Sequence, residues 1–414
     1  MELPKPRTMA ARSLLLLLSL TIAGVFQSRA QLDSHGFISI DCGLPGTASY
    51  VDDGTGLSRR LHRHGTNYDI SPDYITEQLS RTYHNVRSIP NGTRNCYTLR
   101  SLTTGNKYLV RAAFKYGDYD SLNRPPVFDL YVGVNYWKTV NLVDPDDVIR
   151  IVEAIVVVPA DFVQVCLVNT DSGTPFISGL DLRPLNNSLY PQANATRGLV
   201  LLGRFNFGPT NATDVRYPDD PLDRIWLPWI DNTNWTEIST TLTVHNSLVD
   251  IFEAPSKVMQ TAITPRDASK NIELSWDPKP QPKDPSPGYI ANLHFSELQL
   301  LPSGSVRAFY VNLNGDLWYS LPFTPEYLYA DALFSLDPTK RPKQSKGFQD
   351  GYSDFGGNTE NDHEKTKVSA IAAIKAKYRV QKNWIGDPCL PRTLTWDGLT
   401  CRYAISQPPR ITGV

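Results

Sequence analysis

Two stretches decide the fold of this chain: Lys107-Tyr108-Leu109-Val110-Arg111-Ala112-Ala113-Phe114 and Gly288-Tyr289-Ile290-Ala291-Asn292-Leu293-His294-Phe295. Each is a short, mostly apolar run that ends in phenylalanine, as expected of a buried β-strand. In both places a polar loop and a second strand-like run follow, and these lead through a turn to Trp137 or Trp318. The second turn contains Asn314-Gly315, a dipeptide typical of β-hairpins. The repeated pattern predicts two diverged copies of one β-sandwich.

Other parts of the chain also favour β-structure. Short runs rich in Val, Tyr and Thr recur along a sequence that holds 32 prolines, and long helical periodicity is absent from the sandwich region. The predicted fold class is therefore all-β. We expect further strands at 37–43, 127–133, 151–162, 163–168 and 176–182.

The domain boundaries follow from shifts in composition. The first sandwich is expected at 37–185 and the second at 197–334, because Pro184–Thr196 is rich in asparagine and reads as a surface linker. Residues 335–366 are polar and charged, which predicts an exposed polar linker. A helix is expected at 367–381, where the residues on or near one face are Val368, Ile371, Ile374 and Tyr378.

Residues 1–30 have the properties of a signal peptide. Arg12 precedes an apolar run that extends to Phe26, and Ser28-Arg29-Ala30 offers small residues for cleavage before Gln31. A membrane anchor is the alternative, but the run is shorter than the roughly 20 residues that a bilayer requires. We therefore expect the mature chain to be secreted, or to lie at the extracellular face of the plasma membrane through a part absent from this sequence.

Five Asn-x-Ser/Thr motifs agree with secretion and predict a glycoprotein. The acceptor asparagines are Asn91, Asn186, Asn194, Asn211 and Asn234.

The five cysteines divide into a local pair and three others. Cys389 and Cys401 are twelve positions apart, and each follows a tryptophan within a few residues, so in an oxidising compartment they predict a disulfide. The remaining three, Cys42, Cys96 and Cys166, cannot all pair within one chain, so one is expected to be a buried free thiol. No Cys/His spacing indicates a metal site, and no cofactor is expected.

Several ordered motifs give the chain a family resemblance. The motifs lie at Ile38–Pro45, Arg94–Leu99, Gly173–Ser178 and Leu180–Leu185. They resemble the malectin-like domain of plant leucine-rich-repeat receptor kinases. The resemblance covers most of 37–334 and resumes at 370–414, where Asn383–Cys389 and Trp396–Cys401 are similar to the cap that precedes leucine-rich repeats.

The resemblance implies two tandem malectin-like β-sandwiches, followed at 367–414 by a short helical leucine-rich-repeat N-terminal cap and the start of a first repeat at Pro408–Val414. Two stretches depart from the family pattern. Leu57–Thr66 is unusually basic, and Ser335–Lys367 lacks the strand character with which the second sandwich normally ends. A missing strand would leave one sheet edge open.

Catalysis and nucleic-acid binding find no support in the sequence. The net charge is −1, and the basic patch Arg59–His64 reads as a solvated loop. The seven histidines are scattered, without a Gly-x-Ser-x-Gly motif or a glycine-rich phosphate loop. The chain is therefore not expected to be an enzyme.

The best candidate for ligand contact is the loop that follows the first decisive strand. Tyr116 and Tyr119 could stack on a sugar ring, while Asp118 and Asp120 could hold its hydroxyl groups. The alternative, which we favour, is that these aromatic residues form the edge of the core.

A second aromatic cluster contains Trp226, Trp229 and Trp235. These tryptophans could form a partner surface, but burial in the second sandwich is the more common role for such residues.

These features favour an extracellular ligand-binding ectodomain of a malectin-like receptor kinase, or a truncated secreted form of one. Its expected ligand is a peptide, a partner receptor acting as co-receptor, or a cell-wall carbohydrate. The alternative is a lectin-like carbohydrate-binding module without a signalling role. An enzyme that acts on wall polysaccharide is a third, disfavoured hypothesis.

Overall fold

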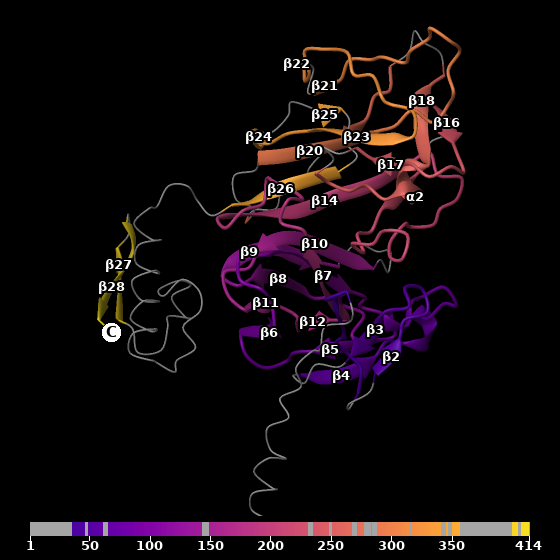
Figure 1. The fold of residues 1–414 in the computed structure, drawn as a ribbon. Coiled ribbons are helices and arrows are strands. Elements are labelled where there is room, and N and C mark those ends of the chain that lie inside the picture. The colour runs from indigo at the N-terminus through magenta and orange to yellow at the C-terminus, as the bar shows by residue number, and fades with distance from the viewer. Residues whose placement is uncertain are drawn as a thin grey trace, which may run out of the picture. The chain divides into compact units, whose positions relative to one another are not determined.

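The computed structural model describes residues 35–45, 49–60, 65–142, 149–230, 235–247, 251–266, 271–276, 283, 288–313, 316–340, 345–346, 350–356, 400–404 and 407–413. In these residues the protein is almost entirely β-structure (Figure 1). The helices described there are one short α-helix and two 3-10 turns: α2 (Ser256–Met259), η1 (Pro72–Tyr74) and η2 (Arg81–Tyr83). The all-β prediction is confirmed.

The strands up to residue 185 make up the N-terminal half. They are β1 (Ile38–Asp41), β2 (Ser49–Val51), β3 (Ser58–Arg60), β4 (Thr66–Asp69), β5 (Asn85–Ser88), β6 (Arg94–Arg100), β7 (Lys107–Phe114), β8 (Val127–Val132), β9 (Asn135–Asn141), β10 (Arg150–Val157), β11 (Phe162–Ser172), β12 (Phe176–Ile177) and β13 (Gly179–Leu185).

The strands from residue 197 to residue 356 make up the C-terminal half. They are β14 (Arg197–Phe207), β15 (Leu227–Trp229), β16 (Trp235–Ser239), β17 (His245–Asn246), β18 (Thr261–Pro265), β19 (Ser275–Trp276), β20 (Gly288–Phe295), β21 (Asn312–Leu313), β22 (Asp316–Leu317), β23 (Tyr329–Phe334), β24 (Thr339–Lys340), β25 (Ser345–Lys346) and β26 (Asp350–Gly356). A separate antiparallel pair, β27 (Thr400–Ala404) and β28 (Gln407–Gly413), follows.

One large sheet runs through both halves. Its order is β17-β23-β20-β26-β14-β10-β7-β13-β1-β3-β2 (Figure 1). The halves meet where β10 pairs antiparallel with β14, with Ala154 opposite Val200 and Ile155 opposite Leu199. A second, four-stranded sheet in the N-terminal half has the order β6-β11-β8-β9.

The pairing order of the N-terminal half recurs in the C-terminal half. Neighbours in β10-β7-β13-β1 are antiparallel, and so are neighbours in β23-β20-β26-β14. In addition, β1 pairs in parallel with β3, as β14 does with β15. Outside the large sheet, the antiparallel pair β4–β5 has its counterpart along the chain in the pair β16–β18. The antiparallel hairpin β8–β9 has its counterpart in β21–β22.

A shared core lies under the junction of the halves. Leu109 and Ile155 come from the N-terminal half and pack in one cluster with Leu199, Phe252 and Ile290 from the C-terminal half. The two halves therefore bury their apolar faces together.

The structure differs from the sequence prediction at the expected polar linker 335–366. Here β26 pairs with β14 on one side and β20 on the other, which gives it the position that β13 has in the N-terminal half. Its sequence, Asp350–Gly356, is rich in Gly and Asp and lacks apolar alternation, so backbone pairing alone identifies it as a strand.

The expected boundary Pro184–Thr196 begins within the last two residues of β13 and ends directly before β14. The signal peptide 1–30, the helix 367–381 and Cys389 lie outside the described residues. The helical cap and the Cys389–Cys401 disulfide stay predictions. In the described part of the chain, no helix is long and apolar enough to cross a membrane.

Candidate ligand-binding regions

The loop that follows β7 does not present the aromatic platform that sequence analysis considered. Tyr116 is 8% exposed and Tyr119 is 7% exposed, so neither ring offers a face to a sugar. Both rings pack against Phe176, at centroid distances of 6.1 and 5.1 Å. The expectation of exposed tyrosines is wrong, and the favoured alternative, a core edge, describes their position.

The acids of this loop hold its backbone. The Tyr116 hydroxyl donates to Asp120 and lies 3.3 Å from the Asp118 carboxylate, which accepts the backbone N–H of Asn123 at 2.7 Å. Gly117 has φ +49°, and a side chain there would meet Ile70 at 2.6 Å, so the tight turn requires glycine. Burial raises the pKa of Tyr119 to about 12, which keeps its hydroxyl protonated.

The tryptophan cluster is also largely interior. Trp226 and Trp235 are buried, and the half-buried Trp229 stacks on Phe207 at 5.4 Å. The indole N–H of Trp226 donates to the buried carboxylate of Asp220 at 2.7 Å. The prediction of burial is confirmed for Trp226 and Trp235.

A buried ionic cluster joins the two halves, and sequence analysis missed it. Asp223, in the loop between β14 and β15, accepts hydrogen bonds from Arg111 of β7 at 3.0 Å and from Arg183 of β13 at 2.7 Å. Arg216 donates to the same carboxylate at 3.0 Å. One acid of the C-terminal half thus bonds to two arginines of the N-terminal half. We call these residues, with Arg59, Glu153, Asp181 and Arg204, the junction cluster.

The other carboxylates of the junction cluster are bridged in the same way. Glu153 of β10 accepts from Arg111 at 2.6 Å and from Arg204 of β14 at 2.8 Å, so it also links the halves. Asp181 accepts from Arg59 at 3.0 Å. Arg59 is therefore buried, contrary to the solvated loop expected at Arg59–His64, while residues 61–64 lie outside the described residues.

The arginines keep these acids ionised. Burial alone would raise the pKa of Asp181, but Arg59, Arg183 and Arg111 outweigh it and hold the pKa at about 2. Burial opposes ionisation of Asp223 too, yet its arginine partners hold its pKa far below the ordinary value. Because every charged group of the junction cluster contacts at least one group of opposite charge, and most of these groups are buried, the cluster has a structural role.

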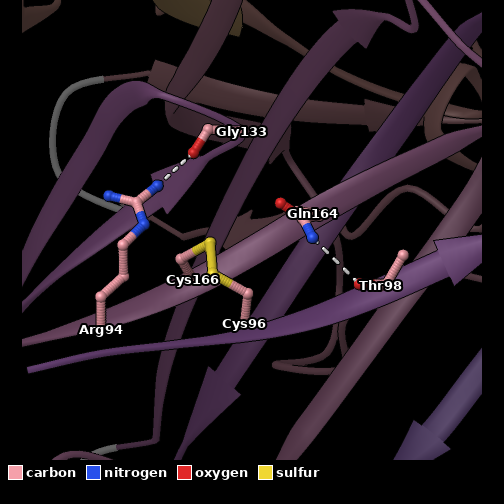
Figure 2. Close-up of a disulfide and its surroundings, with 6 residues drawn as sticks. All are labelled: Arg94, Cys96, Thr98, Gly133, Gln164 and Cys166. Atoms are coloured by element: carbon pink, nitrogen blue, oxygen red, sulfur yellow. Dashed lines mark hydrogen bonds between the residues drawn. A yellow bond between two sulfur atoms is a disulfide. The ribbon is translucent and has the colours of Figure 1, made fainter. Parts of the chain in front are cut away.

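The four-stranded sheet carries a disulfide. Cys96 of β6 and Cys166 of β11 lie directly opposite each other and are bonded (Figure 2). Gln164 donates to Thr98 at 3.1 Å across the same two strands, and Arg94 donates to the carbonyl of Gly133 (Figure 2). Cys42 is the buried free thiol that the odd cysteine count required.

The glycosylation motifs that the structure describes are accessible. Asn91, Asn186, Asn194 and Asn211 are all exposed, and Asn234 lies outside the described residues. Attachment of glycans at these positions stays a prediction.

A segment with several exposed apolar side chains lies in the C-terminal half, at residues 306–321 around β21 and β22. We call it the apolar hairpin face. Its exposed side chains are Val306, Tyr310, Leu317, Tyr319 and Leu321. Contiguous exposed apolar patches mark interaction surfaces in soluble proteins. Sequence analysis recognised the hairpin signal at Asn314-Gly315 but not the exposure of the surface.

Comparisons with known proteins agree with this fold. The family model described as "Malectin-like domain" matches residues 40–349. Two Arabidopsis thaliana proteins, a putative leucine-rich-repeat receptor-like protein kinase and a probable leucine-rich-repeat receptor-like serine/threonine-protein kinase, are 37% and 35% identical over 404 and 405 residues. These alignments cover 93% and 92% of this chain, but only 45% and 46% of the relatives. The chain thus spans about half the length of the curated relatives it matches.

Solved structures share the fold at low identity. The ANX2 ectodomain of Arabidopsis thaliana matches with TM-score 0.59 at 15% identity, over 77% of this chain and 96% of that one. The plant receptor-like kinase FER matches with TM-score 0.58 at 16% identity, over 79% and 92%. A structure of the plant peptide RALF23 in complex with FER and LLG2 matches with TM-score 0.56 at 14% identity, over 78% and 96%. Because both the family model and the relatives cover most of its length, the chain belongs to the malectin-like family and is homologous to plant leucine-rich-repeat receptor-like kinases.

Proposed function

We propose that this chain is the extracellular ligand-binding part of a malectin-like receptor kinase, or a secreted form of that part, and that it recognises a peptide together with a partner protein. The observation that carries the proposal is its homology to receptor-like kinases along 93% of its length. A protein of the same fold, FER, has been solved in complex with the peptide RALF23 and with LLG2. The expected signal peptide and glycosylation motifs support an extracellular location.

The arrangement of the two halves suits this role. The recurring strand order supports two tandem sandwiches of one topology, at 37–185 and from 197 onward, with β26 completing the second. The shared core and the junction cluster hold the halves together. A module fixed in this way presents its loops to a ligand without the cost of ordering a hinge.

A peptide or protein ligand is favoured over a carbohydrate. The sugar hypothesis depended on Tyr116 and Tyr119, which are buried, while Asp118 and Asp120 bond within their own loop. In contrast, the apolar hairpin face offers the leucine and tyrosine side chains that protein interfaces use.

The test is a direct comparison of ligand classes on the intact glycosylated chain. Immobilised chain would be exposed to a panel of secreted plant peptides, each with a scrambled-sequence control, and in parallel to an array of cell-wall glycans. We expect saturable binding to at least one peptide and not to its scrambled form, strengthened by a partner protein. Binding to glycans alone would overturn the proposal and restore the lectin alternative.

A further inference from the structure

The hairpin of β2 and β3 ends the large sheet, and short backbone pairing holds it there (Figure 1). The two strands pair with each other over three residues. In the described residues, β3 pairs with β1 at one position, where Arg60 lies opposite Ile40. Because a two-stranded hairpin alone is marginally stable, side-chain contacts must supply much of its attachment to the sheet.

The central side-chain attachment joins β1, β2 and η2. The hydroxyl of Tyr50, in the middle of β2, donates to the carboxylate of Asp41 at 2.9 Å and lies 3.1 Å from the hydroxyl of Thr82 in η2. The Arg81 guanidinium lies over the Tyr50 ring at 4.2 Å. Asp41 is the last residue of β1. These contacts therefore fasten the hairpin both to the sheet and to the loop that carries η2.

Asp41 lies in a site that disfavours a negative charge. The residue is completely buried, and in the described part of the chain its Oδ1 has no hydrogen-bond partner. The Arg59 guanidinium of β3 bonds to Asp181, at 3.0 Å. Burial raises the pKa of Asp41 from 3.8 to about 6. The hydrogen bond from Tyr50 and the charges of Arg59 and Arg81 oppose this rise without cancelling it.

We propose that protonation of Asp41 controls a local opening of the β2–β3 hairpin, which is closed while the carboxyl group is protonated and opens more often when it is ionised. Opening lets water reach the carboxylate, which removes the cost of burying its charge. With a pKa of about 6 in the closed form and the ordinary pKa of 3.8 in the open form, the closed form binds the proton more tightly. The closed hairpin therefore loses stability as the pH rises from 3.8 to about 6.

Three titratable groups packed around Asp41 keep their charge state across this pH range. Burial raises the pKa of Tyr50 and the pKa of Cys42 above their ordinary values, so both groups stay neutral. Despite the burial of Asp181, its arginine partners hold its pKa at about 2, so this carboxylate stays ionised. The charge that changes at the hairpin is therefore assigned to Asp41.

The hairpin also holds the loop between β4 and β5. Ser80 of this loop donates to Asp52, in the turn of the hairpin, at 3.2 Å, and η2 contacts Tyr50. At the start of the same loop, the backbone N–H of Ser71 donates to the carbonyl of Gly117 at 2.8 Å. An open hairpin releases this loop on one side, so the conformation of the loop should depend on pH.

The experiment is hydrogen exchange followed by mass spectrometry on the intact glycosylated chain between pH 4 and pH 7.5. Exchange rates are corrected for the intrinsic effect of pH, so that they report the opening constant. For peptides that cover 49–60 we expect the opening constant to rise about fiftyfold across this range, as the two pKa values of Asp41 require. Peptides from β7, a fully buried strand, should keep the same protection at every pH.

Three variants separate Asp41 from other causes. Asp41→Asn keeps the side chain neutral and should abolish the rise, although it leaves in place His84, a histidine of the η2 loop that also titrates in this range. Asp53→Asn alters an exposed acid in the turn of the hairpin and should leave the rise intact. Tyr50→Phe removes a hydrogen bond to the carboxylate, so the hairpin should open further at pH 7.5.

Three results would overturn the proposal. The first is an opening constant of the hairpin that does not change with pH. The second is a rise that survives in Asp41→Asn, which would assign the effect to another group. The third is an equal loss of protection in β7, which would mean that the whole half unfolds rather than the hairpin alone.

Discussion

Asp223 shows how much of this fold depends on single buried charges. Its carboxylate faces Arg111, Arg183 and Arg216, and its side chain is completely buried. Asp223→Asn keeps the shape of the side chain but leaves three arginines facing a neutral group. We expect the free energy of unfolding to fall by about 3–5 kcal/mol, measured by urea denaturation followed by tryptophan fluorescence.

The ion pair between Lys283 and Asp129, in which only the lysine is exposed, provides the comparison. Lys283 is more than half exposed, and Asp129 keeps a hydrogen bond from Thr139, so Lys283→Ala should cost less than Asp223→Asn. Equal losses for the two substitutions would show that burial does not set the strength of these pairs.

The pKa of Asp41 is raised, whereas that of Asp181 is lowered, so the two carboxyl groups should make stability change with pH in opposite directions. Burial raises the pKa of Asp41 from 3.8 to about 6, although Tyr50 and Arg59 favour its ionised form. The folded chain therefore binds this proton more tightly than the unfolded chain does. The contribution of Asp41 to stability is full below pH 3.8 and is lost as the pH rises to about 6.

Asp41→Asn should remove this pH dependence. At about 1.4 kcal/mol per pH unit, the pKa change sets a ceiling of about 3 kcal/mol for the effect. Urea denaturation at pH 4 and pH 7 should show the variant gaining stability relative to the unmodified chain at the higher pH. The same difference between variant and unmodified chain at both pH values would contradict a raised pKa.

At the scale of elements, the Cys96–Cys166 disulfide anchors β6 to β11. It joins residues 70 positions apart, and closing a loop of that length stabilises a fold by about 4 kcal/mol in the chain-entropy model. The double substitution Cys96→Ala/Cys166→Ala should therefore lower the denaturation midpoint strongly. Cys42→Ala, which leaves the bond intact, should cost about 1 kcal/mol. A double variant as stable as Cys42→Ala would contradict this role.

Elements whose signal is local were predicted from the sequence. The stretch Lys107–Phe114 forms β7 with the expected bounds. It was predictable because a fully buried strand consists mostly of consecutive apolar residues. β26 was not predicted, since its Gly- and Asp-rich sequence has no apolar alternation and its place depends on β14 and β20. An apolar strand such as β7 can be predicted from its own residues. A polar strand such as β26 can be identified only from the strands that pair with it.

The residues of the candidate site could likewise be named from the sequence, but their surroundings could not. An aromatic residue at a strand end can be a binding platform or a core edge, and only the packing of Tyr116 and Tyr119 on Phe176 decides between them. The pairing of Arg111 with Asp223 joins residues 112 positions apart, so no spacing in the sequence reveals it.

At the scale of the whole molecule, the two halves should unfold together. They share the β10–β14 pairing, the core around Leu109 and Leu199, and the carboxylate of Asp223. Unfolding either half alone would expose that core and leave arginines or acids buried without partners. We therefore expect one calorimetric transition for the sandwich region, with van't Hoff and calorimetric enthalpies in agreement. Asp223→Asn weakens the ionic link while leaving each half's own strands intact, so it should broaden this transition or split it. Two separate transitions in the unmodified chain would mean that the halves are independent domains, and that a ligand could move one against the other.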